Sequence, residues 1–384
     1  MKIDNNKMNK IPFNKPYLSG NELDYIALAV KDGKTSGNQL FSKKVHDFFN
    51  QNYSFKKSLF TTSCTDALEM SAILINICKG DEVIMPSYTF VSTANAFVLR
   101  GAKIVFADSY DNQPNINADN IEPLITSKTK AIVVVHYAGV ACDMDKISAL
   151  CKKYNLYLIE DAAQAIESYY KNKPLGSIGD ISTFSFHETK NISCGEGGLL
   201  AINNDKFLER SEIIWEKGTN RSAFFRGEVN KYGWVDIGSS YLASDILAAY
   251  LYAQIENIDK IQKRRSKIWN IYSELFKEGE KNGWYDLPVI PAYATNNGHM
   301  FYIVCKSGLD RQNLLSHLKQ NKIHAVFHYL ALHKSDYYIG KHDGRILPNA
   351  DKYTERLVRF PFFYELEHHQ IISIYKAVSE FFKK

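Results

Sequence analysis

Several features that define other classes of protein are absent from this sequence. Its 6 cysteines include no C-x-x-C pair, which argues against a zinc or other metal site and against a disulfide framework, and favours a reducing, cytoplasmic setting. There is no run of about 18 apolar residues, so we expect no membrane span. The lysines and arginines form no dense basic block, which argues against a nucleic-acid partner. No G-x-G-x-x-G follows the first expected strand, which disfavours a nicotinamide-linked dehydrogenase.

The composition that is present is ordinary for a globular enzyme. Of the 384 residues, 45% are hydrophobic and 23% are charged, and the net charge of +5 is small. This length suffices for one large domain and one smaller domain, each with its own core. Residues 1–10 are polar and lack the apolar stretch of a signal peptide or anchor, so we predict a disordered N-terminal extension there.

Short apolar runs alternate with amphipathic helical patterns between residues 58 and 203. Strands that alternate with helices of about ten residues are typical of a mostly parallel sheet with helices on both faces. The sequence therefore predicts an α/β fold with such a sheet at its centre. The expected strands are 58–62, 82–86, 103–107, 131–136, 156–160, 181–186 and 198–202, and the expected helices between the early strands are 65–77, 92–100 and 144–154.

The pattern of the chain changes after residue 216. Residues 217–240 form a polar, aromatic-rich stretch, and a loop of this size is usually functional or disordered. From near Tyr241 to Phe276, apolar residues recur at three- or four-residue spacing, which predicts a long helix joining two domains. We therefore predict a large cofactor-binding domain over residues 11–255 and a small α+β domain over residues 256–384 that the long helix enters. The expected elements of the small domain are strands 300–306 and 324–328 and helices 311–320 and 370–382.

Two segments place hydroxyl and aromatic side chains just after expected strands. Ser63, Cys64 and Thr65 lie between a strand and a helix, where hydroxyls and free amide groups can bind a phosphate. Helix capping by Ser63 or Thr65 explains these residues equally well. Phe90 follows the strand 82–86, where an aromatic ring can stack on a flat ligand. Taken alone, Phe90 is better explained as an ordinary core residue.

Two charged residues follow other expected strands. A buried carboxylate needs a partner, and a pyridinium nitrogen would supply one for Asp161, although a helix N-cap explains this residue equally well. A partly desolvated lysine has a lowered pKa, and its neutral amine can attack an aldehyde. Lys190 lies before the glycine-rich residues 195–198 and fits this role, whereas a lysine taken alone is usually a solvated surface charge. Together, the four segments offer the groups that bind pyridoxal phosphate (PLP).

Three motifs carry a resemblance to a known family: PSYTF at 86–90, EDAAQ at 160–164 and FSFHETKN at 184–191. They resemble the sugar aminotransferases of aspartate-aminotransferase fold, which are PLP-dependent enzymes of fold type I, and the resemblance spans nearly the whole chain. It implies a Schiff base between PLP and Lys190, with Asp161 at the ring nitrogen and Gln164 near the ring's 3-oxygen. It also implies a homodimer with each active site at the subunit interface. The other implied cofactor contacts are Phe90 at the ring and, at the phosphate, Ser63, Cys64, Thr65, Ser185 and the neighbouring subunit's Ser240.

A branch of this family that aminates dTDP-4-keto-6-deoxyglucose with L-glutamate, for surface-polysaccharide synthesis, is similar to this chain at 82–106, 136–142, 217–221 and 236–242. The diphosphate of such a substrate requires a cation. Arg221 and Arg226 are our candidates, and both are also explained as solvated surface residues. His328 and Tyr329 are candidates for contacts to the sugar, although a core position explains Tyr329 as well. Many relatives have asparagine where this chain has Ser240.

Several alternatives are open at this point. The acceptor could be a 3-keto or another nucleotide sugar. Sugar dehydratases of the same fold carry histidine in place of the lysine, so Lys190 argues against that reaction. The intact pair of Asp161 and Lys190 disfavours a non-catalytic regulator, although the fold alone does not exclude one.

Overall fold

A seven-stranded sheet, in the order β1-β9-β8-β5-β4-β2-β3, forms the centre of the molecule. The computed structural model describes residues 10–383, so the extension predicted for residues 1–10 lies outside the described residues except for its last position. Only β9 runs antiparallel to its neighbours, which confirms the predicted mostly parallel sheet. The strands are β1 (Lys57–Thr61), β2 (Glu82–Pro86), β3 (Lys103–Ala107), β4 (Thr129–Val135), β5 (Tyr157–Asp161), β8 (Ile181–Ser185) and β9 (Gly198–Ile202).

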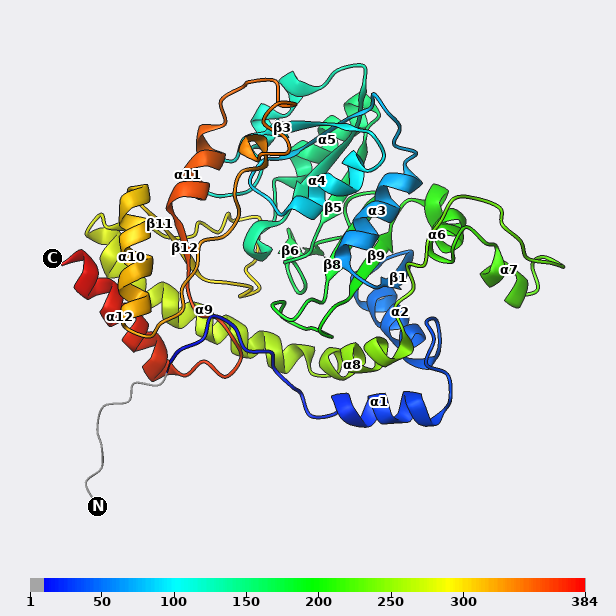
Figure 1. Ribbon diagram of the computed structural model, residues 1–384, viewed down its shortest axis with the longest axis horizontal. Helices are drawn as coiled ribbons and strands as arrows, with labels where there is room; N and C mark the ends of the chain where they lie inside the picture. Colours follow the sequence, from blue (N-terminus) through cyan, green and yellow to red (C-terminus); the bar gives the residue numbers. More distant parts are fainter. Residues whose placement is uncertain (1–9, 384) are drawn as a thin grey trace.

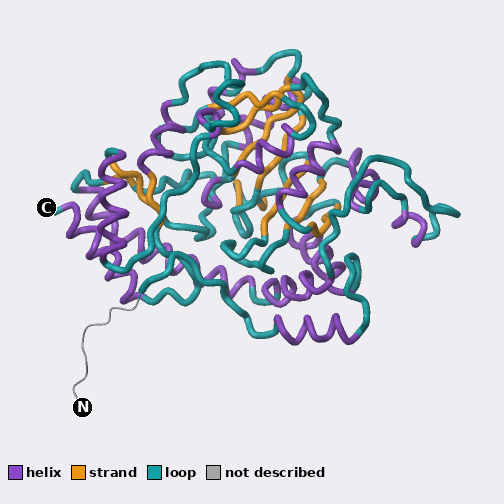
Figure 2. Tube along the Cα trace, in the orientation of Figure 1, coloured by secondary structure: helices purple, strands orange, loops and turns teal. Residues whose placement is uncertain are grey.

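Helices cover both faces of this sheet (Figure 1). Successive residues of a strand point to opposite faces, and in β2 the side chains of Val83 and Met85 join one hydrophobic cluster while Ile84 joins the other. Figure 2 shows the strands in orange enclosed by helices in purple. The first cluster includes residues of α3 (Cys64–Leu74), α4 (Val91–Val98) and α6 (Leu208–Trp215), and the second includes residues of α2 (Leu40–Tyr53), α5 (Met144–Tyr154) and α8 (Asp245–Ile255).

The C-terminal part of the chain has a hydrophobic cluster of its own. There, helices pack on a three-stranded antiparallel sheet in the order β10-β11-β12. Ile11 also joins this cluster, and its N–H donates to the carbonyl of Lys322. The separate cluster supports the division that we propose near residue 255. The elements of this part are α9 (Ile258–Lys281), β10 (Tyr285–Asp286), β11 (Tyr302–Cys305), α10 (Gly308–Gln320), α11 (Pro348–Arg356), β12 (Leu357–Arg359) and α12 (His368–Phe382).

Two predicted elements of the second half are wrong. The helix expected to run unbroken from near Tyr241 is two helices, because α8 ends at Ile255 and α9 begins at Ile258. Residues 324–328 do not form a strand: only Val326 pairs, in an isolated bridge with Arg359. Beyond that bridge the chain leaves the small sheet, which brings the following residues toward the large sheet.

The remaining elements lie at the periphery. Helix α1 (Glu22–Lys31) packs along α8, and β6 (Tyr169–Tyr170) pairs with β7 (Lys173–Pro174). Residues 217–240, which we call the arm, include α7 (Arg221–Phe225) and extend away from the rest of the chain (Figure 1). None of the helices within residues 10–383 combines the length and the apolar character needed to cross a bilayer.

Candidate active site

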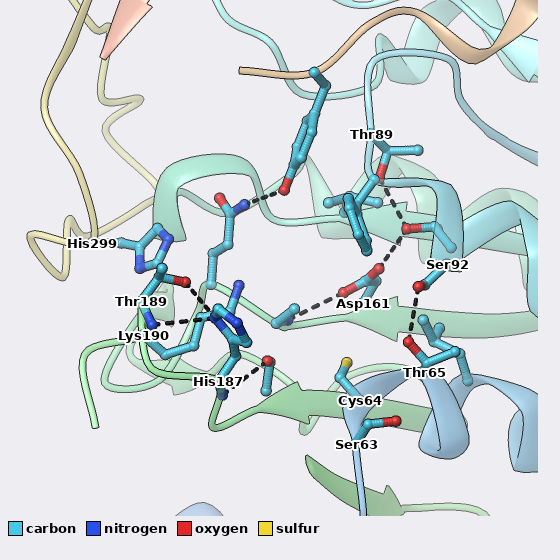
Figure 3. A pocket seen from close by; sticks show the side chains of 18 of the residues that line it. Ser63, Cys64, Thr65, Thr89, Ser92, Asp161, His187, Thr189, Lys190 and His299 are labelled. Atoms are coloured by element: carbon cyan, nitrogen blue, oxygen red, sulfur yellow. Dashed lines mark hydrogen bonds between the residues drawn. The ribbon is translucent and has the colours of Figure 1, made fainter. Parts of the chain in front are cut away.

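A cavity of about 550 Å³ opens at the carboxyl ends of the parallel strands. This is the edge at which ligands of α/β sheets bind, because the strand-to-helix loops converge there. Figure 3 shows Lys190 and His299 at one side of the cavity and Cys64, Thr65 and Asp161 at the other. The predicted site residues that line it are Ser63, Cys64, Thr65, Phe90, Asp161, Gln164, Ser185, Lys190, His328 and Tyr329.

The start of α3 forms one wall of the cavity. Ser63 is the N-cap of this helix, and its Oγ accepts a hydrogen bond of 3.1 Å from the N–H of Asp66. Thr65 Oγ1 donates to Ser92 Oγ at 2.8 Å, which ties α3 to α4. Burial raises the pKa of the Cys64 thiol. Ser63 therefore caps the helix and also lines the cavity, so its capping role does not exclude the predicted contact with a phosphate.

Asp161 is the last residue of β5 and lies buried at the cavity. Its Oδ2 accepts from Thr93 Oγ1 at 2.7 Å, and its Oδ1 accepts from the N–H of Ala163 at 3.2 Å. The chain turns after Asp161 without forming a helix, so the N-cap alternative is wrong. Burial raises the pKa of this carboxyl, and both hydrogen bonds oppose the rise. Among residues 10–383, no basic side chain forms an ion pair with it.

Lys190 also lines the cavity and is not a solvated surface charge. Burial lowers the pKa of its amine, and the charge of Arg359 lowers it further, while Cys64 and Asp161 act in the opposite direction. The next residue, Asn191, is buried and anchors the loop, because its Nδ2 donates at 3.0 Å to the carbonyl of Asn297. The structure thus presents an amine with a lowered pKa on a loop held by hydrogen bonds.

Side chains from the large sheet and from the C-terminal part meet at the opposite wall. Gln164 Oε1 accepts from the N–H of Ala138 at 2.6 Å, and its Nε2 donates to Tyr329 Oη at 2.8 Å. His328 Nδ1 and Tyr137 Oη lie 2.7 Å apart, and burial lowers the pKa of His328 well below its usual value. Phe90 is 55% exposed beside the cavity, so its interpretation as a core residue is wrong.

Three predicted residues lie outside the cavity of this chain, because they belong to the arm. The guanidinium of Arg226 is engaged in ion pairs with Glu228 at 2.7 Å and Glu212 at 2.9 Å. Arg221 lies over the ring of Phe225, 5.1 Å from its centroid. Ser240 is exposed and pairs with Glu216 in an isolated bridge.

Comparison with known proteins places this chain in a family. A family model described as the DegT/DnrJ/EryC1/StrS aminotransferase family matches residues 24–379. The chain belongs to this family. The uncharacterised protein MJ1066 of Methanocaldococcus jannaschii is 33% identical to it over 379 residues, 96% of each chain. The spore coat polysaccharide biosynthesis protein SpsC of Bacillus subtilis is 30% identical and is matched over 97% of each chain.

A solved structure from the same comparison supports the fold. The PLP-form of Spr1654, a sugar aminotransferase by its description, from Streptococcus pneumoniae, superimposes with a TM-score of 0.88 over 98% of this chain and 99% of that chain. The two sequences are 22% identical, so the likeness concerns the fold. The predicted fold type I, a mostly parallel sheet in an α/β protein, is thereby confirmed.

Several residues at the site of this DegT/DnrJ/EryC1/StrS family member were not predicted. Among them, Thr93, His187, His299 and Arg359 line the cavity. The spacing of Thr89 and Thr93, four residues apart after the strand 82–86, is a signal that could have suggested Thr93. The sequence around Arg359 offers no comparable signal, because only the pairing of β12 with β11 brings it to the cavity.

Proposed function

We propose that this chain is a PLP-dependent aminotransferase that transfers the amino group of L-glutamate to a nucleotide-linked keto-deoxysugar. The observation that carries the proposal is that Lys190 and Asp161 line the same cavity. The pKa of the lysine is lowered by burial, and the buried carboxyl has no basic partner in the described part of the chain. Transamination uses a neutral amine to bind the aldehyde of the cofactor and a carboxylate to pair with the protonated nitrogen of its ring.

The residues of the cavity fit PLP. Asp161 offers a buried carboxylate to a protonated ring nitrogen, and Phe90 offers an exposed ring beside it. Ser63 and Thr65 offer hydroxyls at the N-terminus of α3, where free amide groups and the helix dipole favour a phosphate. Ser185, the last residue of β8, offers a third hydroxyl to the same cavity. When bound, PLP supplies an electron-withdrawing ring that stabilises negative charge on the carbon that loses its proton.

Three residues of the cavity then have separate proposed roles in the reaction. Lys190 holds the cofactor covalently before the reaction and moves the proton at the Cα atom of the amino donor. Asp161 keeps the ring nitrogen protonated, because an adjacent negative charge favours the charged form. Gln164, which Tyr329 and the N–H of Ala138 hold in place, orients the 3-oxygen side of the ring.

For the acceptor we propose dTDP-4-keto-6-deoxyglucose. The product is then dTDP-4-amino-4,6-dideoxygalactose, and glutamate leaves as 2-oxoglutarate, so that an amino group and a keto oxygen are exchanged. The sequence resemblance to the dTDP-4-amino-4,6-dideoxygalactose transaminase of enterobacterial common antigen synthesis supports this choice. The name of the relative SpsC, a protein of spore coat polysaccharide biosynthesis, supports a role in making surface polysaccharides. His328 and Tyr329, at the cavity wall, are the proposed sugar contacts.

We further propose that the chain acts as a cytoplasmic homodimer. The arm carries Phe225, Trp234 and Val235 with exposed fractions of 68%, 85% and 54%, which is a large apolar exposure for a free loop. In a dimer, the arm would bring Arg221 and Ser240 to the active site of the neighbouring subunit. This arrangement accounts for their distance from the cavity of their own chain.

The cofactor assignment is tested by colour and by covalent trapping. Purified protein is expected to be yellow, and borohydride should bleach it and fix PLP to Lys190, as mass spectrometry of its peptides would show. The Lys190→Ala variant should lose activity by several orders of magnitude, whereas Lys206→Ala, on the exposed surface, should behave as wild type. A Lys190→Ala protein that turned over glutamate and the keto sugar would refute the proposed role.

The acceptor is tested separately. The enzyme is supplied with glutamate and either dTDP-4-keto-6-deoxyglucose or its 3-keto isomer, and the amino sugar is identified by NMR. We expect amination at C4. Amination of the 3-keto isomer alone would leave the aminotransferase assignment intact and overturn the choice of sugar.

A further inference from the structure

Arg359 places a positive charge in the cavity that the proposed chemistry has not used. It is the last residue of β12, and its side chain lines the same cavity as Lys190. The Nε atom is buried without a hydrogen-bond partner. Within residues 10–383, none of the carboxylates forms an ion pair with this guanidinium, and a buried cation without a partner is costly unless a ligand supplies the anion.

The ring of Phe13 covers one face of this guanidinium. The central carbon of Arg359 lies 4.8 Å from the centroid of the ring. Stacking of this kind fixes the plane of the guanidinium and leaves the N–H groups along its edge free to donate. The neighbouring Asn14 donates through Nδ2 to the carbonyl of Glu188 at 3.3 Å, so the N-terminal segment is tied to the loop that carries Lys190.

The other groups around Arg359 provide no compensating charge. Tyr88, Tyr137 and Tyr329 are the residues whose phenols favour its charged form, while burial lowers its pKa. Two of the three histidines that line the cavity, His299 and His328, are held neutral, because burial lowers the pKa of each well below its usual value. The third, His187, lies 3.6 Å from the carboxylate of Glu196. Among residues 10–383, Arg359 is the one arginine that lines this cavity, and Lys190 is the one lysine. Arg359 therefore offers a fixed positive charge to an incoming substrate.

We propose that Arg359 binds a carboxylate of the amino donor and that Phe13 positions its guanidinium for this contact. The proposal rests on the proposed aminotransferase function and identifies where the donor is recognised. The planar fork of arginine matches the two oxygens of a carboxylate.

The location of Arg359 favours the carboxylate of the donor over the diphosphate of the nucleotide sugar. Its side chain lines the same cavity as Lys190, so an anion that it binds lies in the cavity that holds the reacting atoms. In glutamate, one carboxylate is attached to the very carbon that bears the transferred nitrogen. In a 4-keto sugar nucleotide, the diphosphate is attached at C1, across the ring from the reacting carbon, and would lie farther from the lysine.

The test compares two anions on the PLP-loaded enzyme. Glutamate binding is followed, without sugar, by the change in cofactor absorbance, and binding of dTDP and of glutarate, an unreactive dicarboxylate, is measured by calorimetry. In Arg359→Gln, we expect the dissociation constants of glutamate and glutarate to rise about 10- to 100-fold, the value of a charge-assisted hydrogen bond. The dissociation constant of dTDP should change less than about twofold.

Two further variants serve as controls. Arg356→Gln removes the arginine that ends α11, whose Nε is likewise buried without a partner but which lies outside the cavity. This variant should bind all three ligands as wild type does. Phe13→Leu should weaken glutamate and glutarate binding a few-fold through the loss of stacking, and Phe13→Tyr should restore it.

The outcomes separate the proposed carboxylate site at Arg359 from the proposed use of glutamate as the amino donor. Weaker binding of dTDP alone in Arg359→Gln would assign this arginine to the diphosphate and overturn the inference, as would unchanged binding of all three ligands. A wild-type enzyme that binds glutarate through Arg359 but shows no absorbance change with glutamate would support the carboxylate site and contradict the proposed donor. Retention of the cofactor absorbance by Arg359→Gln verifies that this variant is folded.

Discussion

At the scale of single residues, the site depends on groups that hold the reactive ones in place. Asp161 is useful as a carboxylate only if it stays ionised, and burial opposes this by raising its pKa. Thr93 counteracts the effect through its hydrogen bond of 2.7 Å, and Thr89 Oγ1 lies 2.9 Å from Thr93 Oγ1. A short chain of hydroxyls therefore links the start of α4 to the carboxylate at the end of β5.

Replacing Thr93 by valine tests this link. The change removes the donor to Asp161 and leaves the shape nearly unchanged, so the pKa of the carboxyl should rise further. We expect PLP to bind about tenfold more weakly, and the acid limb of the activity profile to move to higher pH. Equilibrium dialysis and a pH–rate profile measure the two effects. Ser71→Ala, which removes a buried hydroxyl bonded within α3, should alter neither.

At the scale of elements, the turn before α3 is fitted tightly against β9. A Cβ atom at Gly198 would overlap the backbone of Ser63 and Cys64. Only glycine allows β9 to lie this close to the segment that caps α3 and faces the cavity. The proposed phosphate site is thus shaped by the packing of two elements that are far apart in the sequence.

The Gly198→Ala variant should therefore be impaired in two ways. The methyl group forces the turn and the strand apart, which should lower the free energy of unfolding by about 1–3 kcal/mol and weaken PLP binding. Thermal unfolding and a PLP titration report the two effects. At Gly340 an added Cβ meets no atom within 4 Å, so Gly340→Ala should change neither quantity. Normal PLP binding by Gly198→Ala would contradict the proposal that the packing of β9 against this turn shapes the phosphate site.

A buried histidine joins α2 to β1. The Nε2 of His46 accepts a hydrogen bond of 2.9 Å from the N–H of Phe60, and burial lowers the pKa of the ring from 6.5 to about 4. The unfolded chain binds a proton at His46 below about pH 6.5, whereas the folded chain does so only near pH 4. The histidine therefore contributes stability that is complete above pH 6.5 and is lost as the pH falls toward 4.

This contribution predicts a pH-dependent stability. Between pH 6.5 and 4, His46 should account for a fall of about 3 kcal/mol in the free energy of unfolding. His46→Gln retains an acceptor for Phe60 but cannot titrate, so urea unfolding of this variant should depend less steeply on pH over that range. His368→Gln, at the exposed start of α12, should retain the wild-type slope. Equal slopes for wild type and His46→Gln would show that the histidine does not carry this dependence.

At the scale of the whole molecule, the arm is the part least explained by a single chain. It extends from the body (Figure 1), exposes 85% of Trp234, and carries predicted site residues away from the cavity of its own chain. The homodimer that we propose would account for both features. In that arrangement, the arm would be buried and its polar residues would reach a neighbouring cavity.

The prediction concerns the mass in solution. Wild-type protein should sediment as a species of twice the 43.9 kDa of one chain. A Phe225→Glu, Trp234→Glu double variant should shift the equilibrium to the monomer and lose most of its activity, because a charge at each position opposes burial. Ile346→Glu, at a site that is 83% exposed elsewhere, should remain dimeric. An unchanged dimer in the double variant would exclude the arm from the interface.

Much of the architecture could be predicted because it depends on local pattern. The bounds of β2, β3, β9 and α5 agree with the sequence prediction residue for residue, since each is an uninterrupted apolar or amphipathic segment between turn residues. Residues 324–328 have the same apolar pattern as a strand, yet only one residue pairs. Whether such a segment joins a sheet depends on the neighbouring chain, which the local pattern does not contain.

The sequence by itself determined the α/β class and most strands of the large sheet, because these follow from residues that are near one another in the chain. It also indicated Asp161 and Lys190 as candidates for the reactive groups. Only the tertiary structure decided which side chains surround that pair. Thr93 approaches Asp161 from 68 residues away, and Tyr329 approaches Gln164 from 165 residues away. Arg359 enters the cavity from a second sheet. Contacts of this kind arise when distant segments pack around a common core, and no local pattern specifies which segments will meet.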